Sequence, residues 1–434
     1  MGGEWSNLPF SKAVLVNPQV NLQRGSYYPF VDMAAVNSEF RWVYAKEKRK
    51  FSGSGSRFQH GDTLMARITP CLENGKIARY FSIEGLGFGH GSTEFIVIRG
   101  RPGITETDFA YYLTLWEEVH SYAVSHMTGT SGRQRVPTDC FDYLTVPIPP
   151  LPEQRAIAHI LGTLDDKIEL NRRMNQTLEE MARALFKSWF VDFDPVCAKA
   201  VVRREHPDWS NAQVSRAACP TLKPEIAELF PDEFENSELG EIPKGWRVSR
   251  LGDIADVNWG DTNVTKSSYV NEGYLAYSAK GPDGFLSYYD YDCVGVVVSA
   301  IGANSGFTWL ARGKWSCIKN TIRFWSIVSD ISTEYLYFAT HGNNIWPLRG
   351  SAQPFISQTD AQNLRVLHPS NGLARKFGDT ISPLFDRIDF SIHESRTLAA
   401  LRDTLLPKLI SGVLRVKDAE RFLKRMGESF IGVS

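Results

Sequence analysis

The chain has 434 residues, of which 43% are hydrophobic and 22% are charged, and its formal net charge is −1. A chain of this length exceeds what one hydrophobic core supports, so we expect about two to four globular domains. The near-neutral charge excludes a protein that binds nucleic acid through a general excess of positive charge. Any such binding must rest on local clusters of basic residues.

The six cysteines stand at positions 71, 140, 197, 219, 293 and 317, and none belongs to a Cys-x-x-Cys pair. This scatter indicates neither a zinc site nor a disulfide framework. The N-terminus has no basic-then-apolar signal segment, and no run approaches about 18 apolar residues. We therefore expect a cytoplasmic protein with no membrane span.

Residues 1–150 are expected to form a mixed domain of short strands and turns. Strand-like runs occupy 13–16, 63–68, 77–81 and 94–99, with Gly- and Asn-rich turns between them. A helix is expected over 106–120.

The segment 41–67 contains the run KEKRKFSGSGSR, which predicts a mobile cationic loop. Lysine and arginine release counterions when they neutralise DNA phosphates, so this loop is a candidate DNA contact. An ordinary solvated surface loop is the alternative. The predicted contact residues are Lys46, Lys48, Arg49, Lys50, Arg57 and Arg67.

A second candidate loop, TGTSGRQRV, covers 128–136 just before the strand-like run that leads into a long helix. Its side chains can donate hydrogen bonds to base edges and phosphates. An ordinary turn is again the alternative. The predicted contact residues are Ser131, Arg133, Gln134 and Arg135.

The segment 153–190 predicts one long helix. Its apolar residues recur at alternating steps of four and three, the heptad spacing of a coiled-coil seam. Two seam positions, Asn171 and Asn175, are polar, and Pro152 can open the helix because its missing N–H would be unpaired there. The helix would span roughly 58 Å and act as a spacer. We place it within a region 151–195, followed by an acidic linker over 196–244.

Residues 245–370 are expected to form a second mixed domain, with strands over 273–278, 294–300, 307–311 and 321–327. The run ISTEYLYF resembles the helical run near residue 104 in order and composition. The polar candidates for DNA contact in this domain are Tyr277, Ser278, Lys280, Asn304, Lys319, Asn320, Ser351 and Gln353.

The long helix recurs in the region 371–434. At an offset of 220 residues, LDDKIEL at 164–170 aligns with LFDRIDF at 384–390, and the polar seam positions recur as Ser391 and Ser395. Unrelated coiled coils would share the apolar seam but not the run of charges, so we favour an internal duplication. The second helix is expected to run over 373–411 and to end at Gly412.

Catalytic motifs are missing from the sequence. It lacks a phosphate-binding GxxxxGK[ST] loop, a His-Glu-x-x-His pair, an EF-hand and a Gly-x-Ser-x-Gly elbow. The nuclease pattern PD…(D/E)xK and the adenine-methyltransferase tetrapeptide (N/D)PP(F/Y) are also incomplete. His60, His90 and His126 have no second ligand at metal spacing, so we expect no metal site.

The whole chain resembles the specificity subunits of type I restriction–modification enzymes. The resemblance rests on PPLPEQR at 149–155, LDDKI at 164–168, LGEIPKGW at 239–246 and LLPKLISG at 405–412. Two departures are visible. The run that leads into the second helix, PSNGLAR at 369–375, departs from the PPLPEQR run before the first helix, so the second helix is expected to start later. The N-terminus lacks a tryptophan-led opening as full as that at Trp246.

The resemblance implies an α+β fold with two target recognition domains, each followed by a long helix, and with the helices packed as an antiparallel coiled coil. Each domain would read one half of a bipartite DNA target, and the helices would set the spacer. The polar seam residues Asn171, Asn175, Ser391 and Ser395 can fix the register of the helices, with a drifting heptad that turns them to solvent as the alternative. Two modification subunits would bring S-adenosylmethionine and methylate adenine N6. Restriction subunits that use ATP and Mg²⁺ could join them, and no cofactor would bind this chain.

Three alternatives are open at this point. The chain could be a solitary duplicated DNA-binding protein, a self-contained methyltransferase or nuclease, or a structural coiled-coil adaptor. The missing motifs argue against the enzyme. The divergence of the two domains beside such similar helices argues against the adaptor.

Overall fold

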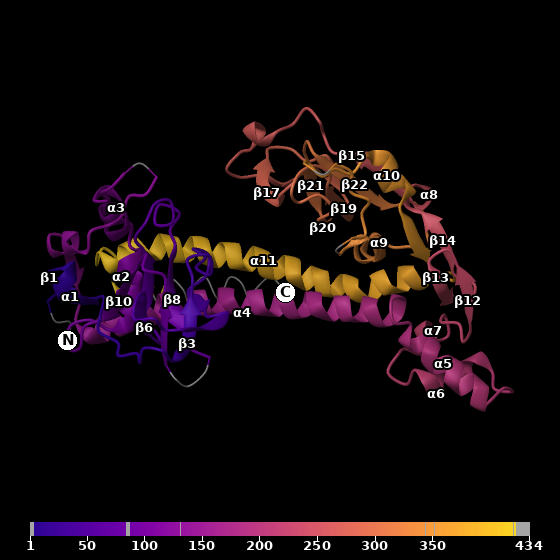
Figure 1. Cartoon of the computed structure of the whole chain (residues 1–434), viewed down its shortest axis with the longest axis horizontal. Coiled ribbons are helices and arrows are strands. Elements are labelled where there is room, and N and C mark those ends of the chain that lie inside the picture. Colours follow the sequence, from indigo (N-terminus) through magenta and orange to yellow (C-terminus); the bar gives the residue numbers. More distant parts are fainter. Residues whose placement is uncertain are drawn as a thin grey trace. The chain divides into compact units, whose positions relative to one another are not determined.

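The computed structural model describes residues 4–83, 87–130, 132–342, 344–350, 352–419 and 421. Its contacts divide the chain into two units. Unit 1 comprises Met1–Met174 and Phe390–Ser434, and unit 2 comprises Asn175–Asp389. Each unit therefore contains one sheet-rich domain together with part of each of two long helices (Figure 1).

The domain of unit 1 is built from short strands, and its helices are also short. In chain order the elements are β1 (Ser6–Pro9), α1 (Phe10–Ala13), β2 (Val14–Val16), β3 (Tyr27–Val31), β4 (Trp42–Tyr44), β5 (Glu47–Lys50), β6 (Ser56–Gln59), β7 (Thr63–Ala66), β8 (Ile77–Phe81), β9 (Phe88–Gly91), β10 (Phe95–Gly100), α2 (Thr107–Leu115), α3 (Glu117–Ser125), η1 (Thr138–Asp142) and β11 (Thr145–Ile148). They form sheets of order β2-β10-β7-β8-β4, β5-β3-β9-β6 and β1-β11.

Two expectations for this domain need correction. The helix expected over 106–120 is two helices, because Trp116 adopts φ −58° and ψ 129° and interrupts the turn between α2 and α3. The segment 41–67 is not a loop, since it carries β4, β5, β6 and β7. The basic run escaped prediction because all four residues of β5 are exposed, so no alternation of apolar and polar side chains marks the strand.

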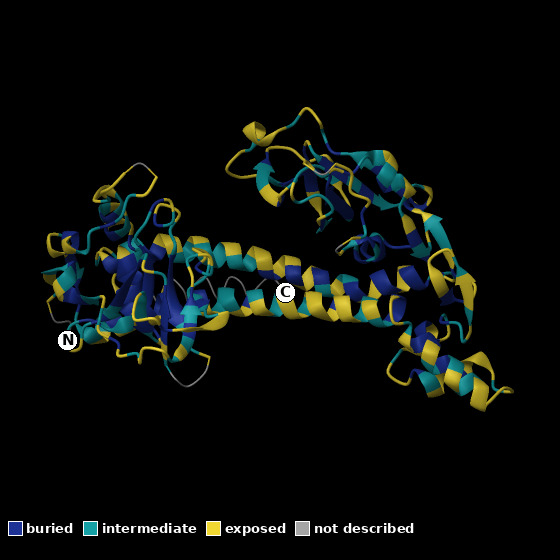
Figure 2. Ribbon diagram, viewed as in Figure 1, coloured by how far each residue is buried: buried dark blue, intermediate teal, exposed yellow. Residues whose placement is uncertain are grey.

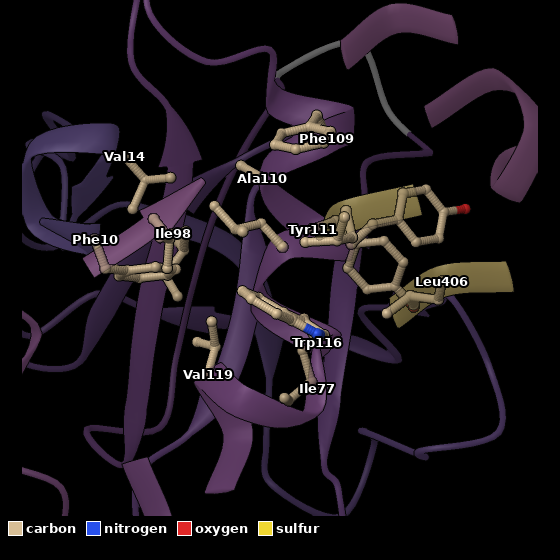
Figure 3. Packing of buried hydrophobic residues seen from close by; sticks show 14 of the residues in the cluster. Phe10, Val14, Ile77, Ile98, Phe109, Ala110, Tyr111, Trp116, Val119 and Leu406 are labelled. Carbon is tan, nitrogen blue, oxygen red and sulfur yellow. The ribbon is translucent and has the colours of Figure 1, made fainter. Parts of the chain in front are cut away.

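The core of unit 1 lies between the five-stranded sheet and α2, and it continues onto the C-terminal part of the second long helix. Phe10, Ile98 and Phe109 are fully buried there, and Leu406 packs into the same cluster. Figure 3 shows these side chains converging from the sheet, α2 and the long helix. This burial of apolar surface attaches the domain to the helix pair.

Unit 2 has its own short elements between the two long helices. They are α5 (Asp194–Glu205), α6 (Asn211–Ala218), α7 (Pro224–Ala227), β12 (Phe234–Ser237), β13 (Gly240–Pro243), β14 (Arg247–Arg250), α8 (Leu251–Ile254), β15 (Ala255–Trp259), η2 (Lys266–Ser268), β16 (Tyr274–Ser278), β17 (Gly281–Leu286), β18 (Tyr291–Asp292), β19 (Gly295–Ser299), β20 (Thr308–Ala311), β21 (Lys314–Cys317), β22 (Thr321–Ser326), α9 (Thr333–Thr340), α10 (Gln358–Asn363) and β23 (Arg365–His368).

The acidic stretch over 196–244 is folded: it contains most of α5, then α6 and α7, and the hairpin β12–β13. Lys199 is fully buried, and its ammonium group donates to Asn211 Oδ1 at 2.8 Å and to the Ala227 carbonyl at 3.1 Å. Arg203 pairs with Asp232 at 2.6 Å. The buried, hydrogen-bonded ammonium group and the half-buried ion pair hold a compact segment together, although composition alone suggested a linker.

The two domains share one topology. Apart from the hairpin β12–β13, the sheets of unit 2 have the orders β15-β22-β19-β20, β17-β16-β21-β18 and β14-β23, each with a counterpart in unit 1, where the first sheet has β4 as an additional strand. The amide of Phe10 donates to the Leu144 carbonyl at 2.7 Å, and the equivalent amide of Leu251 donates to the Leu364 carbonyl at 2.8 Å. Trp5 also stands before β1 as Trp246 stands before β14, so the first half does have a tryptophan-led opening. The internal duplication is visible in hydrogen-bond register as well as in sequence.

The long helices are α4 (Leu151–Phe190) and α11 (Leu373–Ile410). In unit 1 the first part of α4 packs on the last part of α11, and in unit 2 the last part of α4 packs on the first part of α11. The helices therefore run antiparallel, as expected. Figure 2 shows buried positions recurring along both helices, with exposed positions between them.

The starts of the two helices differ as their sequences suggest. Gln154 is fully buried, and its side chain donates to the carbonyls of Ile104 and Pro149, both at 2.8 Å, and accepts from the Glu106 amide at 2.9 Å. At the equivalent position α11 has Ala374, and that helix begins at Leu373, the equivalent of Glu153. Gly412 ends α11 with a φ of +76°, a conformation that glycine adopts without strain.

Candidate nucleic-acid interface

At one end of the sheet β2-β10-β7-β8-β4 in unit 1, and of the sheet β15-β22-β19-β20 in unit 2, two loops meet that are far apart in the sequence. In unit 1 these are the loop after β7 and the loop over 128–136. The Thr69 amide donates to the Gln134 carbonyl at 3.0 Å, and the Val136 amide donates to the Arg67 carbonyl at 2.9 Å. We call the two joined loops of each unit, with the strand ends beside them, the loop edge.

Arginines dominate the loop edge of unit 1, but they are not equivalent. Arg135 forms a bidentate pair with Glu94, with Nε–Oε2 at 2.9 Å and Nη2–Oε1 at 2.7 Å. The hydrogen bonds from Arg135 lower the pKa of Glu94 below its usual value. Arg133 is exposed and Arg67 is half-buried. Arg133 is therefore the arginine of this loop best placed to reach a ligand.

A cleft of about 390 Å³ lies beside this edge and joins two of the predicted contact residues. Arg57 and Arg67 line it together with Asn17, Gln19 and Thr93. The Arg57 guanidinium rests over the Phe51 ring at 5.0 Å and donates to the Gly53 carbonyl at 3.2 Å. The cleft therefore offers charged donors beside polar side chains, a combination that suits a phosphate or a base edge.

The remaining basic candidates of unit 1 lie on the edge strand β5 or next to it. Lys46, Lys48 and Lys50 are exposed, whereas Arg49 pairs with Glu47 at 2.5 Å and lies over the Phe30 ring at 4.0 Å. β5 pairs with β3 alone in its sheet. Charged side chains on an edge strand also protect it from pairing with other chains, so this strand has a structural reason to be basic.

In unit 2 the loop after β19 meets the loop that precedes α10. The Gly302 amide donates to the Pro354 carbonyl at 2.9 Å, and Asn304 Nδ2 donates to the Ala279 carbonyl at 3.3 Å. Lys280 and Gln353 are exposed near these contacts. The turn at Lys319 and Asn320 lies beside the same strand end, because the Ala300 amide donates to the Asn320 carbonyl at 2.9 Å.

Two candidates of unit 2 are buried. Tyr277 is 4% exposed, packs against Trp315 and donates to the Leu310 carbonyl at 3.5 Å. Ser278 is 3% exposed, and its hydroxyl accepts from the Lys280 amide at 3.0 Å. Both belong to the domain core and its turn, so neither side chain is exposed in this structure, and their contact with DNA stays a prediction. Three successive residues of β16, from Ala276 to Ser278, are buried, so no alternation within the strand separates these two from surface residues.

The sequence analysis did not identify the exposed aromatic residues at the loop edge of unit 2. Phe307 is 56% exposed and Phe355 is 38% exposed. Aromatic rings of this kind can stack on bases or insert at a base step. An apolar residue that ends a glycine- or proline-rich turn was the available signal. Ser131 and Ser351, which were also predicted, lie outside the described residues.

Two of the four polar seam residues, Asn171 and Ser391, are buried, and Asn175 and Ser395 are half-buried. Asn171 is fully buried, and its amide donates to Glu394 Oε2 at 2.7 Å and to Ser395 Oγ at 3.2 Å. It also reaches the carbonyl of Ser391, its own repeat equivalent 220 residues away, at 3.4 Å. The alternative that these side chains face solvent is excluded for Asn171 and Ser391, and a register role remains.

The described part of the chain offers neither a metal-binding cluster nor a membrane-spanning helix. No three His, Cys, Asp or Glu side chains there gather closely enough to hold a metal ion. Among the described helices, none combines the length and the hydropathy that a transmembrane span requires.

Residues 17–180 match the family model of the type I restriction modification DNA specificity domain. The HindI specificity subunit of Haemophilus influenzae is 26% identical over 430 residues, covering 87% of this chain and 92% of that protein. The predicted resemblance to type I specificity subunits is confirmed. The MjaIX specificity subunit of Methanocaldococcus jannaschii is 23% identical over 334 residues, covering 72% of this chain and 70% of that protein.

The fold is similar to that of a solved specificity subunit. The crystal structure of a type I restriction–modification system S subunit from M. genitalium matches with a TM-score of 0.52 and 16% identity, over 94% of this chain and 96% of that one. The family model ends within α4, so the second domain is related to the first through topology and not through that match.

Proposed function

We propose that this chain is the DNA sequence-specificity subunit of a type I restriction–modification system. One observation carries the proposal: a single sheet topology occurs twice, while the residues at the two loop edges differ. Unit 1 presents Arg133 and the Arg57–Arg67 cleft, whereas unit 2 presents Lys280, Gln353 and exposed aromatics. A duplicated fold with different contact residues suits two domains that each recognise a different DNA sequence.

In this role each domain reads one half of a bipartite DNA target. Base edges in the major groove are distinguished by directional donors and acceptors, which arginine, lysine, glutamine and asparagine supply. The helix pair sets the number of unread base pairs between the half-sites, and the bonded seam at Asn171 fixes its register. The other basic residues contribute contacts to phosphates, which position the protein without reading sequence.

The chain itself carries no catalytic step in this proposal. Two modification subunits dock on the helix pair, bind S-adenosylmethionine and methylate adenine N6 after the base is flipped out of the duplex. Restriction subunits that use ATP and Mg²⁺ join the complex where they are present. A cytoplasmic location follows from access to the chromosome, and the six free cysteines suit a reducing compartment.

Two exposed apolar residues at repeat-equivalent positions support a docking role for the helices. Leu170 on α4 is 59% exposed and Phe390 on α11 is 56% exposed, and they are related by the 220-residue offset. Single exposed apolar side chains are common on protein surfaces, but these two occupy one and the same position of the repeat, which suits a repeated contact. Two like positions suit two copies of one partner.

A methylome tests the proposal. The chain is co-expressed with a modification subunit in a host without adenine methylation, and N6-methyladenine is mapped by single-molecule sequencing. We expect one split motif with a fixed spacer. No methylation despite an assembled complex would favour a solitary DNA-binding protein, and an unsplit motif would refute the two-domain reading.

Point variants assign the half-sites. Arg133→Ala should relax or abolish reading of one half-site, and Lys280→Ala should affect the other. Arg204→Ala is the matched control, because Arg204 is exposed on α5 and its Nε donates to the Ala200 carbonyl of the same helix at 3.2 Å. If both loop-edge variants altered the same half-site, the assignment of one domain to each half would be wrong.

A further inference from the structure

A half-buried arginine ties the domain of unit 1 to α4. Arg41 Nη2 pairs with Asp166 Oδ1 at 2.5 Å, and its Nη1 donates to the Gly162 carbonyl at 3.1 Å. The Arg41 side chain is 11% exposed, whereas that of Asp166 is 66% exposed. The arginine thus belongs to the domain interior, and the carboxylate stands on the helix surface.

Unit 2 contains a second contact of the same kind. Arg312 pairs with Asp386 on α11, and its Nε donates to Asp389 Oδ2 at 2.8 Å. The Arg312 side chain is 14% exposed and that of Asp386 is 65% exposed. The burial of the two partners therefore matches the burial in unit 1.

The aspartates are copies of each other, but the arginines are not. Asp166 and Asp386 are separated by the 220-residue repeat offset and belong to the runs LDDKIEL and LFDRIDF. Arg41 precedes β4, a strand without a counterpart among the described strands of unit 2, and Arg312 follows β20. Two domains with different sequences thus reach the same helix site from different elements.

We infer that Asp166 and Asp386 are repeated attachment points, and that Arg41 and Arg312 are positioning residues that fix each recognition domain on its helix. We call each of the two contacts, Arg41–Asp166 and Arg312–Asp386, a latch. This inference rests on the proposed function. A guanidinium with two or more hydrogen bonds restrains orientation better than a single contact, because its donors lie in a rigid plane. Apolar packing alone is not directional and permits small rotations. The latch would therefore keep each loop edge at a fixed place along the DNA.

The test replaces the exposed partner, so the domain interior stays intact. Asp166→Ala and Asp386→Ala each remove one charged hydrogen bond from a latch, and alanine is favourable in a helix. Asp379→Ala is the matched control, because Asp379 is an exposed aspartate of α11 that pairs with Arg375 of the same helix at 3.5 Å. Asp166→Glu keeps the charge and should retain most of the latch.

Two readouts are needed, one with DNA and one without. In the methylome of the co-expressed complex, each latch variant should keep both half-site sequences while the share of sites with an altered spacer rises about tenfold, as expected for the loss of one charged hydrogen bond. In hydrogen exchange of the isolated chain, the amides of 38–44 should exchange about tenfold faster in Asp166→Ala than in the wild type. The control and Asp166→Glu should match the wild type in both.

The outcomes separate the inference from the proposed function. A wild-type chain without a split motif would refute the proposed function, and the exchange rates would then decide the latch on their own. Unchanged exchange at 38–44, or an unchanged spacer in a complex that otherwise methylates, would overturn the latch. Altered half-site sequences in Asp166→Ala would also overturn it, because they would indicate a role in base reading.

Discussion

A buried polar network distinguishes unit 1 from unit 2. Asp165 is 5% exposed, and its carboxylate accepts from Arg402 Nη1 at 2.7 Å and from the Tyr112 hydroxyl at 2.7 Å. At the 220-residue offset Asp165 and Arg402 correspond to Phe385 and Ala182, and Tyr112 corresponds to Phe338 when the first residues of α2 and α9 are aligned. All three equivalents are buried and apolar. Equivalent buried positions are therefore filled by hydrogen-bonded polar side chains in unit 1 and by apolar side chains in unit 2.

We predict that Arg402→Ala destabilises unit 1 by about 3 kcal/mol. Removing one partner leaves an uncompensated buried carboxylate, and the value lies at the low end for such losses because the Arg402 side chain is 19% exposed. The triple variant Tyr112→Phe, Asp165→Phe, Arg402→Ala copies unit 2. We expect it to recover to within about 1 kcal/mol of the wild type, since apolar replacement of a buried pair is often neutral.

The assay is hydrogen exchange in increasing urea, followed on peptides of α2 and the first half of α4. It reports the opening free energy of unit 1 even where the whole chain does not unfold in one step. An Arg402→Ala variant within about 1 kcal/mol of the wild type would refute the reasoning, because a buried carboxylate left without its partner should cost more than that. A triple variant weaker than the single one would show that the two halves do not pack equivalently.

Three further predictions concern the seam, the loop edge and the helix surface. Asn171→Leu should keep both half-sites but mix spacer lengths in the methylome; an unchanged spacer together with unchanged assembly would count against it. The Arg135 guanidinium lowers the pKa of Glu94 in the folded chain. The stabilisation that this ion pair gives is therefore complete above the pKa of a glutamate in the unfolded chain, near 4.3, and is lost as the pH falls through the pKa of Glu94 in the folded chain. The advantage in Tm of the wild type over Glu94→Gln should therefore shrink below about pH 4, and a constant difference between about pH 7 and pH 3 would contradict this. Leu170→Ser and Phe390→Ser should each release one modification subunit in native mass spectrometry, and full retention of both subunits in the double variant would exclude this docking surface.

Local patterns predicted the elements whose burial follows a short period. The heptad steps placed α4 and α11 to within a few residues, and the 220-residue repeat predicted two similar halves. β8 and β19 are buried along almost their whole length, and they were found as short apolar runs bounded by turn residues. β5 was missed because every side chain on it is exposed, which leaves no pattern to read.

The sequence by itself determined the duplication, the two long helices and the kinds of side chain present in the predicted contact loops, because these depend on composition and on spacing along the chain. Only the tertiary structure decided which polar groups meet. Arg135 is bound to Glu94, Tyr277 is buried in the core, and Arg41 reaches Asp166 across 125 residues of sequence. Such contacts depend on how strands pair and on how each sheet packs against its helix, and no local periodicity encodes them.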